Sequence, residues 1–205
     1  MILTPLAPDA VPGLLAAFDA GLDEFPFARV VFARIAATLR QCPDLKADLH
    51  AGRGKAIALA QEMGIGVCDE EPAAAYSWDG KVIRTRSETS VVFHEVAHWQ
   101  IAPPARRALY DFGLGAGPET GRIDEANRAA CVDFAIQEAE ENLASLLGIL
   151  WETEYNEPAI LAFAEQNWLE LPERPYTRRH FALHLDELKT RGLIDADGRP
   201  VHRSA

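Results

Sequence analysis

The sequence predicts an α+β fold that is mostly helical, with a small β-hairpin or sheet beside one central helix. Two observations support this prediction. Apolar residues recur at the three- and four-residue spacing of helices along most of the chain, whereas the two-residue alternation of a strand is found in one short stretch, residues 81–86. That stretch follows Asp79-Gly80, a dipeptide typical of tight hairpin turns.

The length of 205 residues, with 48% hydrophobic and 25% charged residues, is sufficient for one substantial core. We therefore expect a single domain, 1–205, in which residues 1–70 form a helical packing region and residues 71–205 carry the functional site. The net charge of −11 argues against a nucleic-acid surface, which needs a basic face, and suits a basic partner.

Three widely spaced cysteines, Cys42, Cys68 and Cys131, match neither a disulfide framework nor a CxxC pair. We interpret them as reduced, buried thiols. No apolar run reaches membrane-spanning length, and the first residues lack the basic region of a signal peptide. We therefore expect a cytoplasmic protein that binds no membrane.

Three short helices are expected before the hairpin, and they cover residues 8–22, 30–39 and 55–63. Asp9 can cap the first of them, and Gly64 and Gly66 end the third. They carry no candidate functional residues, so we expect them to pack against the rest of the chain.

The expected hairpin pairs residues 75–78 with residues 81–86. Apolar and basic residues alternate in its second strand, as in a half-exposed or edge strand. Such a strand can bind an extended substrate segment through backbone hydrogen bonds. An ordinary hairpin that covers the core is an equally good interpretation.

The next helix, from Ser87 or Thr89 as its cap to about residue 102, carries the pattern HExxH. His94 and His98 are four residues apart, so both imidazoles lie on one face and can bind one divalent metal. Glu95 reaches the open side of that ion, where water or substrate would bind. The alternative is an amphipathic helix with two incidental histidines, but burying three such groups without a partner would be costly.

The remainder is expected to be helical, with residues 124–152 in one or two pieces, then 158–168 and 176–193. A second histidine pair, His180 and His184, also has ligand spacing. Arginines precede it and no acid follows its first histidine, so we interpret it as ordinary surface or partly buried histidines.

Two histidines need a further protein ligand, and a carboxylate from a second helix commonly supplies it. Glu138, Glu141 and Asn142 share one stripe of the helix within 124–152. We choose Glu138 as the third ligand, with Glu141 as an alternative or additional one, and the neighbouring groups as support. Glu140 is expected to point away into solvent.

The residues around the motif closely resemble the bacterial elongation factor P hydroxylase family, which carries a run HExxHW-x-IA-x-x-ARR-x-L-x-DFG. Here that run extends from His94 to Gly113. Glu138 and Asn142 reproduce a family Glu that is followed four residues later by an amide, and 171–175 resembles a further family segment. The similarity covers the region from Phe93 to the last helix, whereas 51–89 looks different from the family.

This resemblance implies a metal-dependent oxygenase, with iron as the metal, that hydroxylates a modified lysine on a protein, elongation factor P or a similar lysine-bearing protein. Glu95 or Glu141 would then bind a second iron or orient a water. Arg106, Arg107 and Asp111 would position substrate or support the site, with surface salt bridges as the simpler interpretation.

The expected fold, an HExxH helix beside a small hairpin or sheet, is similar to the zincin arrangement, and the alternative enzyme is a zinc peptidase. Glu95 would then be the general base for a zinc-bound water. Glu141 would be the third ligand, because the small Ala144 three residues later suits close helix packing. The metal distinguishes the two, since tetrahedral zinc favours the peptidase and iron favours the oxygenase. A structural metal is disfavoured because no cysteine lies near the histidines in sequence.

Overall fold

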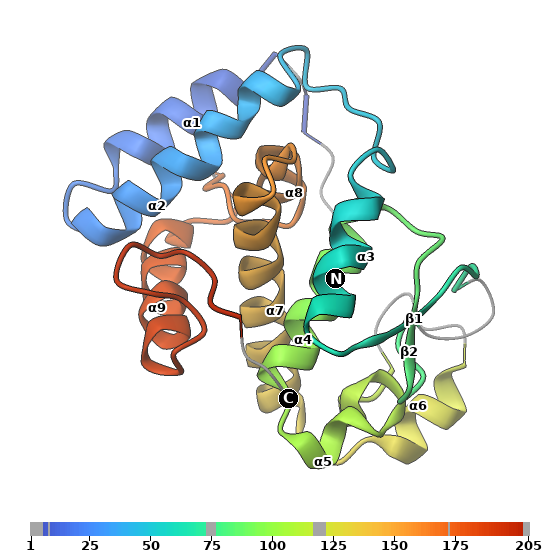
Figure 1. The fold of residues 1–205 in the computed structure, drawn as a ribbon. Helices are drawn as coiled ribbons and strands as arrows, with labels where there is room; N and C mark the ends of the chain where they lie inside the picture. The colour runs from blue at the N-terminus through green and yellow to red at the C-terminus, as the bar shows by residue number, and fades with distance from the viewer. Residues whose placement is uncertain (1–5, 8, 73–76, 117–121, 172, 203–205) are drawn as a thin grey trace. The chain divides into compact units, whose positions relative to one another are not determined.

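The computed structural model describes residues 6–7, 9–72, 77–116, 122–171 and 173–202, and it confirms an α+β fold that is mostly helical (Figure 1). The chain divides into two compact units. The first consists mainly of Asp48–Gly148, and the second of Ile2–Ala47 with Ile149–Val201. This division does not coincide with the expected boundary at residue 70.

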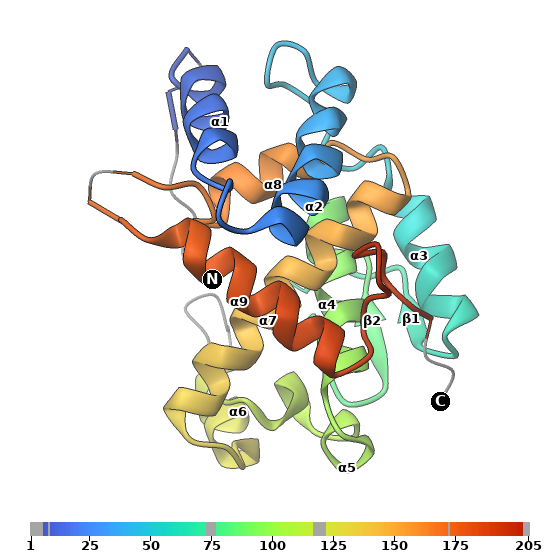
Figure 2. The same cartoon turned by 90° about the vertical axis from the view of Figure 1, so that its left-hand side faces the viewer.

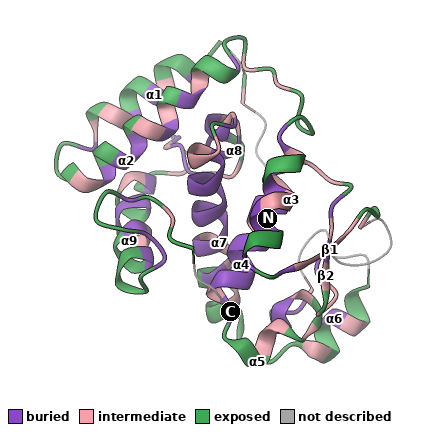
Figure 3. Cartoon of the chain, in the orientation of Figure 1, coloured by how far each residue is buried: buried purple, intermediate pink, exposed green. Residues whose placement is uncertain are grey.

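The first unit carries the small sheet and the HExxH helix. Its elements are α3 (Arg53–Glu62), β1 (Gly66–Cys68), β2 (Val82–Arg84), α4 (Thr89–Ile101), α5 (Pro104–Arg107), the 3-10 turn η2 (Tyr110–Gly113) and α6 (Ile123–Ala129). The long helix α7 (Phe134–Glu154) begins in the first unit and ends in the second. Residues 143–152 of α7 are all buried, and all of them except Ser145 and Glu152 are apolar or glycine (Figure 3).

The second unit has a core of aromatic rings. Its elements are α1 (Val11–Ala20), α2 (Pro26–Ala37), the 3-10 turn η1 (Thr38–Gln41), α8 (Ala159–Glu165) and α9 (Thr177–Thr190), shown from a second side in Figure 2. Phe18, Phe32, Phe163 and Phe181 are almost fully buried. The Phe18 ring lies 4.8–5.9 Å from the other three, in tilted and edge-on pairs that aromatic rings favour.

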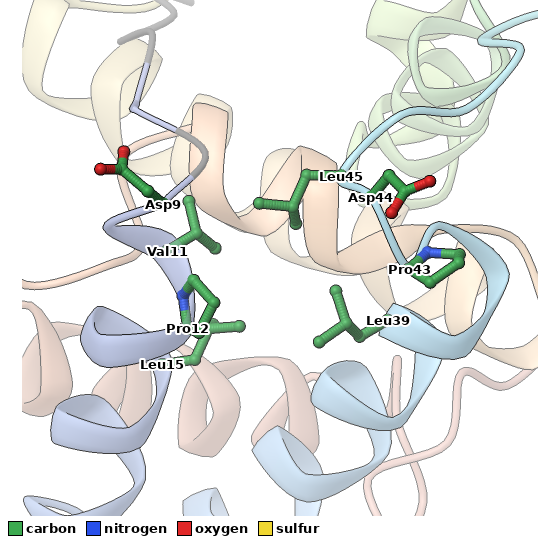
Figure 4. A pocket seen from close by; sticks show the side chains of 8 residues that line it. All are labelled: Asp9, Val11, Pro12, Leu15, Leu39, Pro43, Asp44 and Leu45. Carbon is green, nitrogen blue, oxygen red and sulfur yellow. The ribbon is translucent and has the colours of Figure 1, made fainter.

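An apolar cavity of about 280 Å³ lies at the edge of the second unit, between the start of α1 and the segment after η1. Leu15, Leu39 and Leu45 are among the side chains that line it (Figure 4). The carboxylates of Asp9 and Asp44 point away from the space between these side chains. None of the described helices is long and apolar enough to cross a membrane.

The prediction of the sheet was only partly correct. β2 pairs with β1 in parallel register, Gly66 opposite Val82, and not with the expected preceding strand. Of that expected strand, residues 75 and 76 lie outside the described residues, and Trp78 forms one isolated antiparallel bridge with Ile83. The turn between them is as expected, because Gly80 has a φ of +90° and the Asp79 carboxylate accepts hydrogen bonds from the amides of residues 81 and 82.

The helices agree more closely with prediction than their caps do. The segment expected at 124–152 forms two helices, α6 and α7. The cap residue of α4 is Glu88, with no side-chain cap hydrogen bond, so the choice of Ser87 or Thr89 was wrong. Asp9 likewise does not cap α1, whose cap is Ala10. Cys42 is buried, whereas Cys131 is exposed, contrary to expectation.

Candidate metal centre

Helix α4 places the HExxH residues at the core of the first unit. Val92, Phe93, Val96 and Ala97 are fully buried, so packing fixes α4 on several sides. Pro104 begins the next helix, and α4 ends at Ile101 before the two prolines. His98 and Glu95 are buried with the apolar residues, at 3% and 7% exposure. Buried polar groups of this kind need partners, which the neighbouring helix α7 brings.

The side chains of His94, His98 and Glu141 converge on one point. The Nε2 atoms of the two histidines lie 2.9 Å apart. Each lies 3.5 Å from a different oxygen of the Glu141 carboxylate. Among the described residues, these three form the one group of three or more potential ligands whose donor atoms all lie within 4.8 Å of one another.

Gly148 allows α7 to pack closely against α4. A Cβ atom there would lie 3.2 Å from both the Cα and the N of His94, which is tighter than ordinary van der Waals contact. Gly148 is seven residues after Glu141, so the two lie on the same stripe of α7. The fully buried Ala144 lies between them. The small residues therefore let α7 approach α4 and bring the Glu141 carboxylate to the histidines.

The charges at this point are strongly coupled. Burial, followed by the charge of His98, lowers the pKa of His94. Burial opposes charge on His98 as well, but the Glu141 carboxylate outweighs it and raises the pKa of His98 to about 9. Burial opposes charge on Glu141 too, yet the charge of His98 holds its pKa well below the usual range. The three side chains are therefore electrostatically coupled, and the positive charge of His98 stabilises the negative charge of Glu141.

This donor set fits a divalent metal. Two imidazole nitrogens and a carboxylate are ligands that zinc and iron both accept. A metal ion would replace the proton that the histidines share, which is the usual exchange when a metal binds imidazoles. Glu95 lies beside the group, and burial raises its pKa to about 8, with Asp111 and Glu141 adding to the effect. One of its oxygens is buried without a hydrogen-bond partner.

Aromatic stacking holds the ring of His98. Phe112 stacks on His98 at 5.4 Å between ring centroids, and Trp78 stacks on Phe112 at 5.2 Å with the planes 2° apart. The Nδ1 atom of His98 is buried without a hydrogen-bond partner. In metal sites such a nitrogen usually donates to a carboxylate or carbonyl that fixes the ring. Here the stack performs that orientation instead.

Phe112 lies in a strained turn. Asp111, Phe112 and Gly113 have φ values of +50°, +54° and +70°, in the left-handed region that side chains other than glycine disfavour. Arg106 stabilises the turn, because its guanidinium donates to the Phe112 carbonyl at 3.3 Å and also pairs with the buried carboxylate of Glu140. Glu140 is therefore not in solvent, and that prediction was wrong.

Arg107 also contacts residues near the turn, including Trp99 and Trp78. Its guanidinium lies 3.8 Å above the Trp99 ring and donates to the Ala102 carbonyl. The Arg107 carbonyl accepts a hydrogen bond from the Trp78 indole at 2.9 Å. Both arginines therefore have structural partners in the first unit, which leaves their expected substrate-positioning role a prediction.

The structure brings Glu141, and not Glu138, to the two histidines. Glu138 is exposed on α7, one turn before Glu141, and Asn142 is half-buried beside it. His180 and His184 belong to the second unit, where their rings lie 4.0 Å apart and Trp168 stacks on His180. Sequence reasoning missed Trp78, Phe112 and Gly148. The signals were the Trp-Asp-Gly and Asp-Phe-Gly runs and the glycine inside an apolar helix.

Comparison with known proteins supports the resemblance seen in the sequence. Residues 69–149 match the family model described as elongation factor P hydroxylase. The matched part contains α4, the turn with Asp111 and Phe112, and the portion of α7 that carries Glu141 and Gly148. The match begins inside the segment 51–89 that was expected to differ from that family, so this expectation is wrong for residues 69–89, and the match ends before residues 171–175. No curated protein and no solved structure matches the chain.

Proposed function

We propose that the chain is an iron-dependent hydroxylase that acts on a lysine side chain of a protein, elongation factor P or a similar lysine-bearing protein. The observation that carries the proposal is the convergence of His94, His98 and Glu141 inside the segment that matches the hydroxylase family. A substrate that serves translation would have to share a compartment with this protein, which favours the cytoplasm.

We assign Glu141 as the third ligand in preference to Glu138. The Glu141 oxygens lie 3.5 Å from both imidazole nitrogens, whereas Glu138 is exposed one turn earlier. The bound iron would supply positions for oxygen on the face left open by two histidines and one carboxylate. Hydroxylation of a C–H bond by oxygen also consumes two electrons and two protons and releases water, so an external reductant is required.

The protein's own residues have separate roles in this proposal. Glu95, buried and neutral near pH 7, holds a proton on a carboxyl oxygen that has no other hydrogen-bond partner. It is placed to donate to an oxygen atom beside the ligands. The stack of Trp78 and Phe112 orients His98 and excludes water from that side. The acidic chain attracts a basic substrate.

Metal analysis and activity test the proposal together. Anaerobically purified protein is expected to bind about one equivalent of iron or more, and His94→Ala is expected to bind none at the site. With iron, oxygen and a reductant, the wild-type protein should add one oxygen atom to lysine-modified elongation factor P, read by mass spectrometry. Iron binding without any oxygen-dependent mass change would contradict the hydroxylase assignment.

A matched pair tests the ligand. Glu141→Gln and Glu138→Gln remove one carboxylate charge each from adjacent turns of α7. We expect Glu141→Gln to lose metal at least tenfold in affinity and Glu138→Gln to keep it. The reverse result would restore the choice made from sequence.

A zinc peptidase remains the second candidate, because the same ligands and Glu95 are the parts that such an enzyme uses. Stoichiometric zinc that is lost in His94→Ala, with peptide cleavage that is lost in Glu95→Gln, would favour it over the hydroxylase.

A further inference from the structure

We propose that the stripe Phe134–Glu138–Glu141 of α7 is the track along which a basic, lysine-bearing protein enters the metal site. The inference rests on the proposed function and names how its substrate is recognised. Phe134 would contact an apolar residue of the partner, and Glu138 would pair with the ammonium group of the incoming lysine.

The exposure of the three ligands shows from which side the site is reached. The side chain of His98 is 4% exposed and that of His94 is 15% exposed, whereas that of Glu141 is 33% exposed. Trp78 and Phe112 close the side of His98. A substrate therefore approaches along α7, past Glu141.

The residues that precede Glu141 on that helix form a continuous path. Phe134 is seven residues and Glu138 three residues before Glu141, so all three lie on one stripe. At 1.5 Å per residue, Phe134 lies about 10.5 Å and Glu138 about 4.5 Å from Glu141 along the helix axis. The flexible four-carbon stem of a lysine can extend over the single turn between Glu138 and the ligands.

The first turn of α7 exposes a large aromatic side chain beside acidic ones. Phe134 is 75% exposed, although a large aromatic side chain would gain by burial. The adjacent acidic groups Asp133 and Glu138 are also exposed. Exposed aromatic residues with an acidic rim are typical of contact surfaces for a basic protein. This proposal also gives a role to Glu138, which was predicted as a metal ligand but does not belong to the group formed by His94, His98 and Glu141.

The experiment compares kinetic constants of iron-loaded variants on lysine-modified elongation factor P. We expect Phe134→Ala to raise KM about five- to tenfold, Glu138→Gln about threefold and Glu138→Lys about tenfold or more. Ile136→Ala is the matched control, because Ile136 is 49% exposed on the opposite side of the same helical turns. It should change KM less than twofold, and all four variants should keep the iron content of the wild type.

A second readout separates charge recognition from folding. Added salt should raise the KM of the wild type, and it should raise that of Glu138→Gln less, because one screened attraction has been removed. Equal KM values for the wild type, Phe134→Ala and Glu138→Lys would overturn the inference while the hydroxylase function stands. Absence of oxygen-dependent modification by the wild type would overturn the proposed function, and this inference with it.

Discussion

The two units of the chain bury different kinds of groups. The second unit buries a cluster of aromatic rings around Phe18 and Phe163. The first unit buries polar atoms without hydrogen-bond partners on His94, Glu95 and His98, and on nearby Thr89 and Glu140, although the second unit also has such an atom on Thr177. It also contains three consecutive left-handed residues, 111–113. Aromatic burial stabilises a core, whereas unpartnered polar atoms and backbone strain reduce stability.

The difference fits the proposal that the first unit gives up stability for a metal site. If His94, His98 and Glu141 bind an ion as proposed, the ion would offset the electrostatic cost of burying them. We therefore expect substitutions in the second unit to change stability alone, and substitutions around α4 to change metal binding and stability together.

The largest effect on stability is expected in the aromatic core. Phe163→Ala should lower the free energy of unfolding by about 3–5 kcal/mol, because a fully buried ring leaves a cavity. Urea denaturation measures the loss, and the folded fraction should keep its metal. Leu183→Ala on α9, which is 56% exposed, is the control and should stay within about 0.5 kcal/mol. A loss of metal affinity in Phe163→Ala would contradict the expectation that substitutions in the second unit change stability alone.

The second effect is stabilisation by the metal itself. At a free metal concentration 100-fold above Kd, binding should raise the free energy of unfolding by about 2.7 kcal/mol. Thermal denaturation with iron and with a chelator measures the shift, and His98→Ala should abolish it. The same shift in His98→Ala would mean that the metal acts at another place.

A third prediction concerns pH and lies in the second unit, where one acidic group departs from the apolar pattern. Burial, with the charges of Glu157 and Glu165, raises the pKa of Glu152 to about 8. In the unfolded chain this group ionises near pH 4.5, so the folded state binds the extra proton between pH 4.5 and 8 and loses stability as pH rises through that window. Glu152→Gln should remove this loss, because a glutamine side chain has no proton that titrates in this window.

Urea denaturation of wild type and Glu152→Gln at pH 5.5 and 8.5 measures that effect. The difference between the two proteins should grow with pH and favour the variant. A difference that stays constant between these pH values would show that Glu152 is already ionised in the folded protein at pH 5.5.

A fourth prediction compares a matched pair of glycines. Gly113, with φ +70°, and Gly198, with φ +75°, lie in different units, and a Cβ at either would meet a side-chain atom closer than 3.0 Å. Alanine at either position should cost about 1–3 kcal/mol in the free energy of unfolding. Gly113→Ala alone should also weaken metal binding, because it displaces the turn that holds Phe112 against His98. Equal metal affinity in the two variants would contradict the role of the stack.

Local patterns predicted the helices and the two histidines because both depend on spacing within one element. The HExxH residues needed only the 3.6-residue period of α4, and α3, α6 and α7 also lie where periodicity put them. The candidate third ligand was harder to predict from the sequence, because Glu138 and Glu141 lie on the same stripe of α7. Which of the two reaches the histidines depends on how closely α7 packs against α4. The small residue Ala144 favoured Glu141, but without the second helix its importance could not be weighed.

Non-local pairing was the part that the sequence did not reveal. β1 is three residues long and follows the end of α3, so its glycine was interpreted as a helix stop, although it pairs with β2. Glu140 was assigned to solvent because its stripe differs from that of Glu141, yet Arg106 from α5 lies on that side. The left-handed turn at residues 111 and 112 has no sequence signal other than the glycine that follows.

The contact at Gly148 also sets the distance between α4 and α7. Glycine has no Cβ atom, and a Cβ atom at this position would lie only 3.2 Å from the backbone of His94. A single methyl group there would push the helices apart by a few tenths of an ångström and widen the space between imidazoles and carboxylate. If these residues bind a metal as proposed, the size of ion that fits would depend on Gly148, which lies two turns from Glu141 on α7 and against the backbone of His94, and directed evolution could change this position.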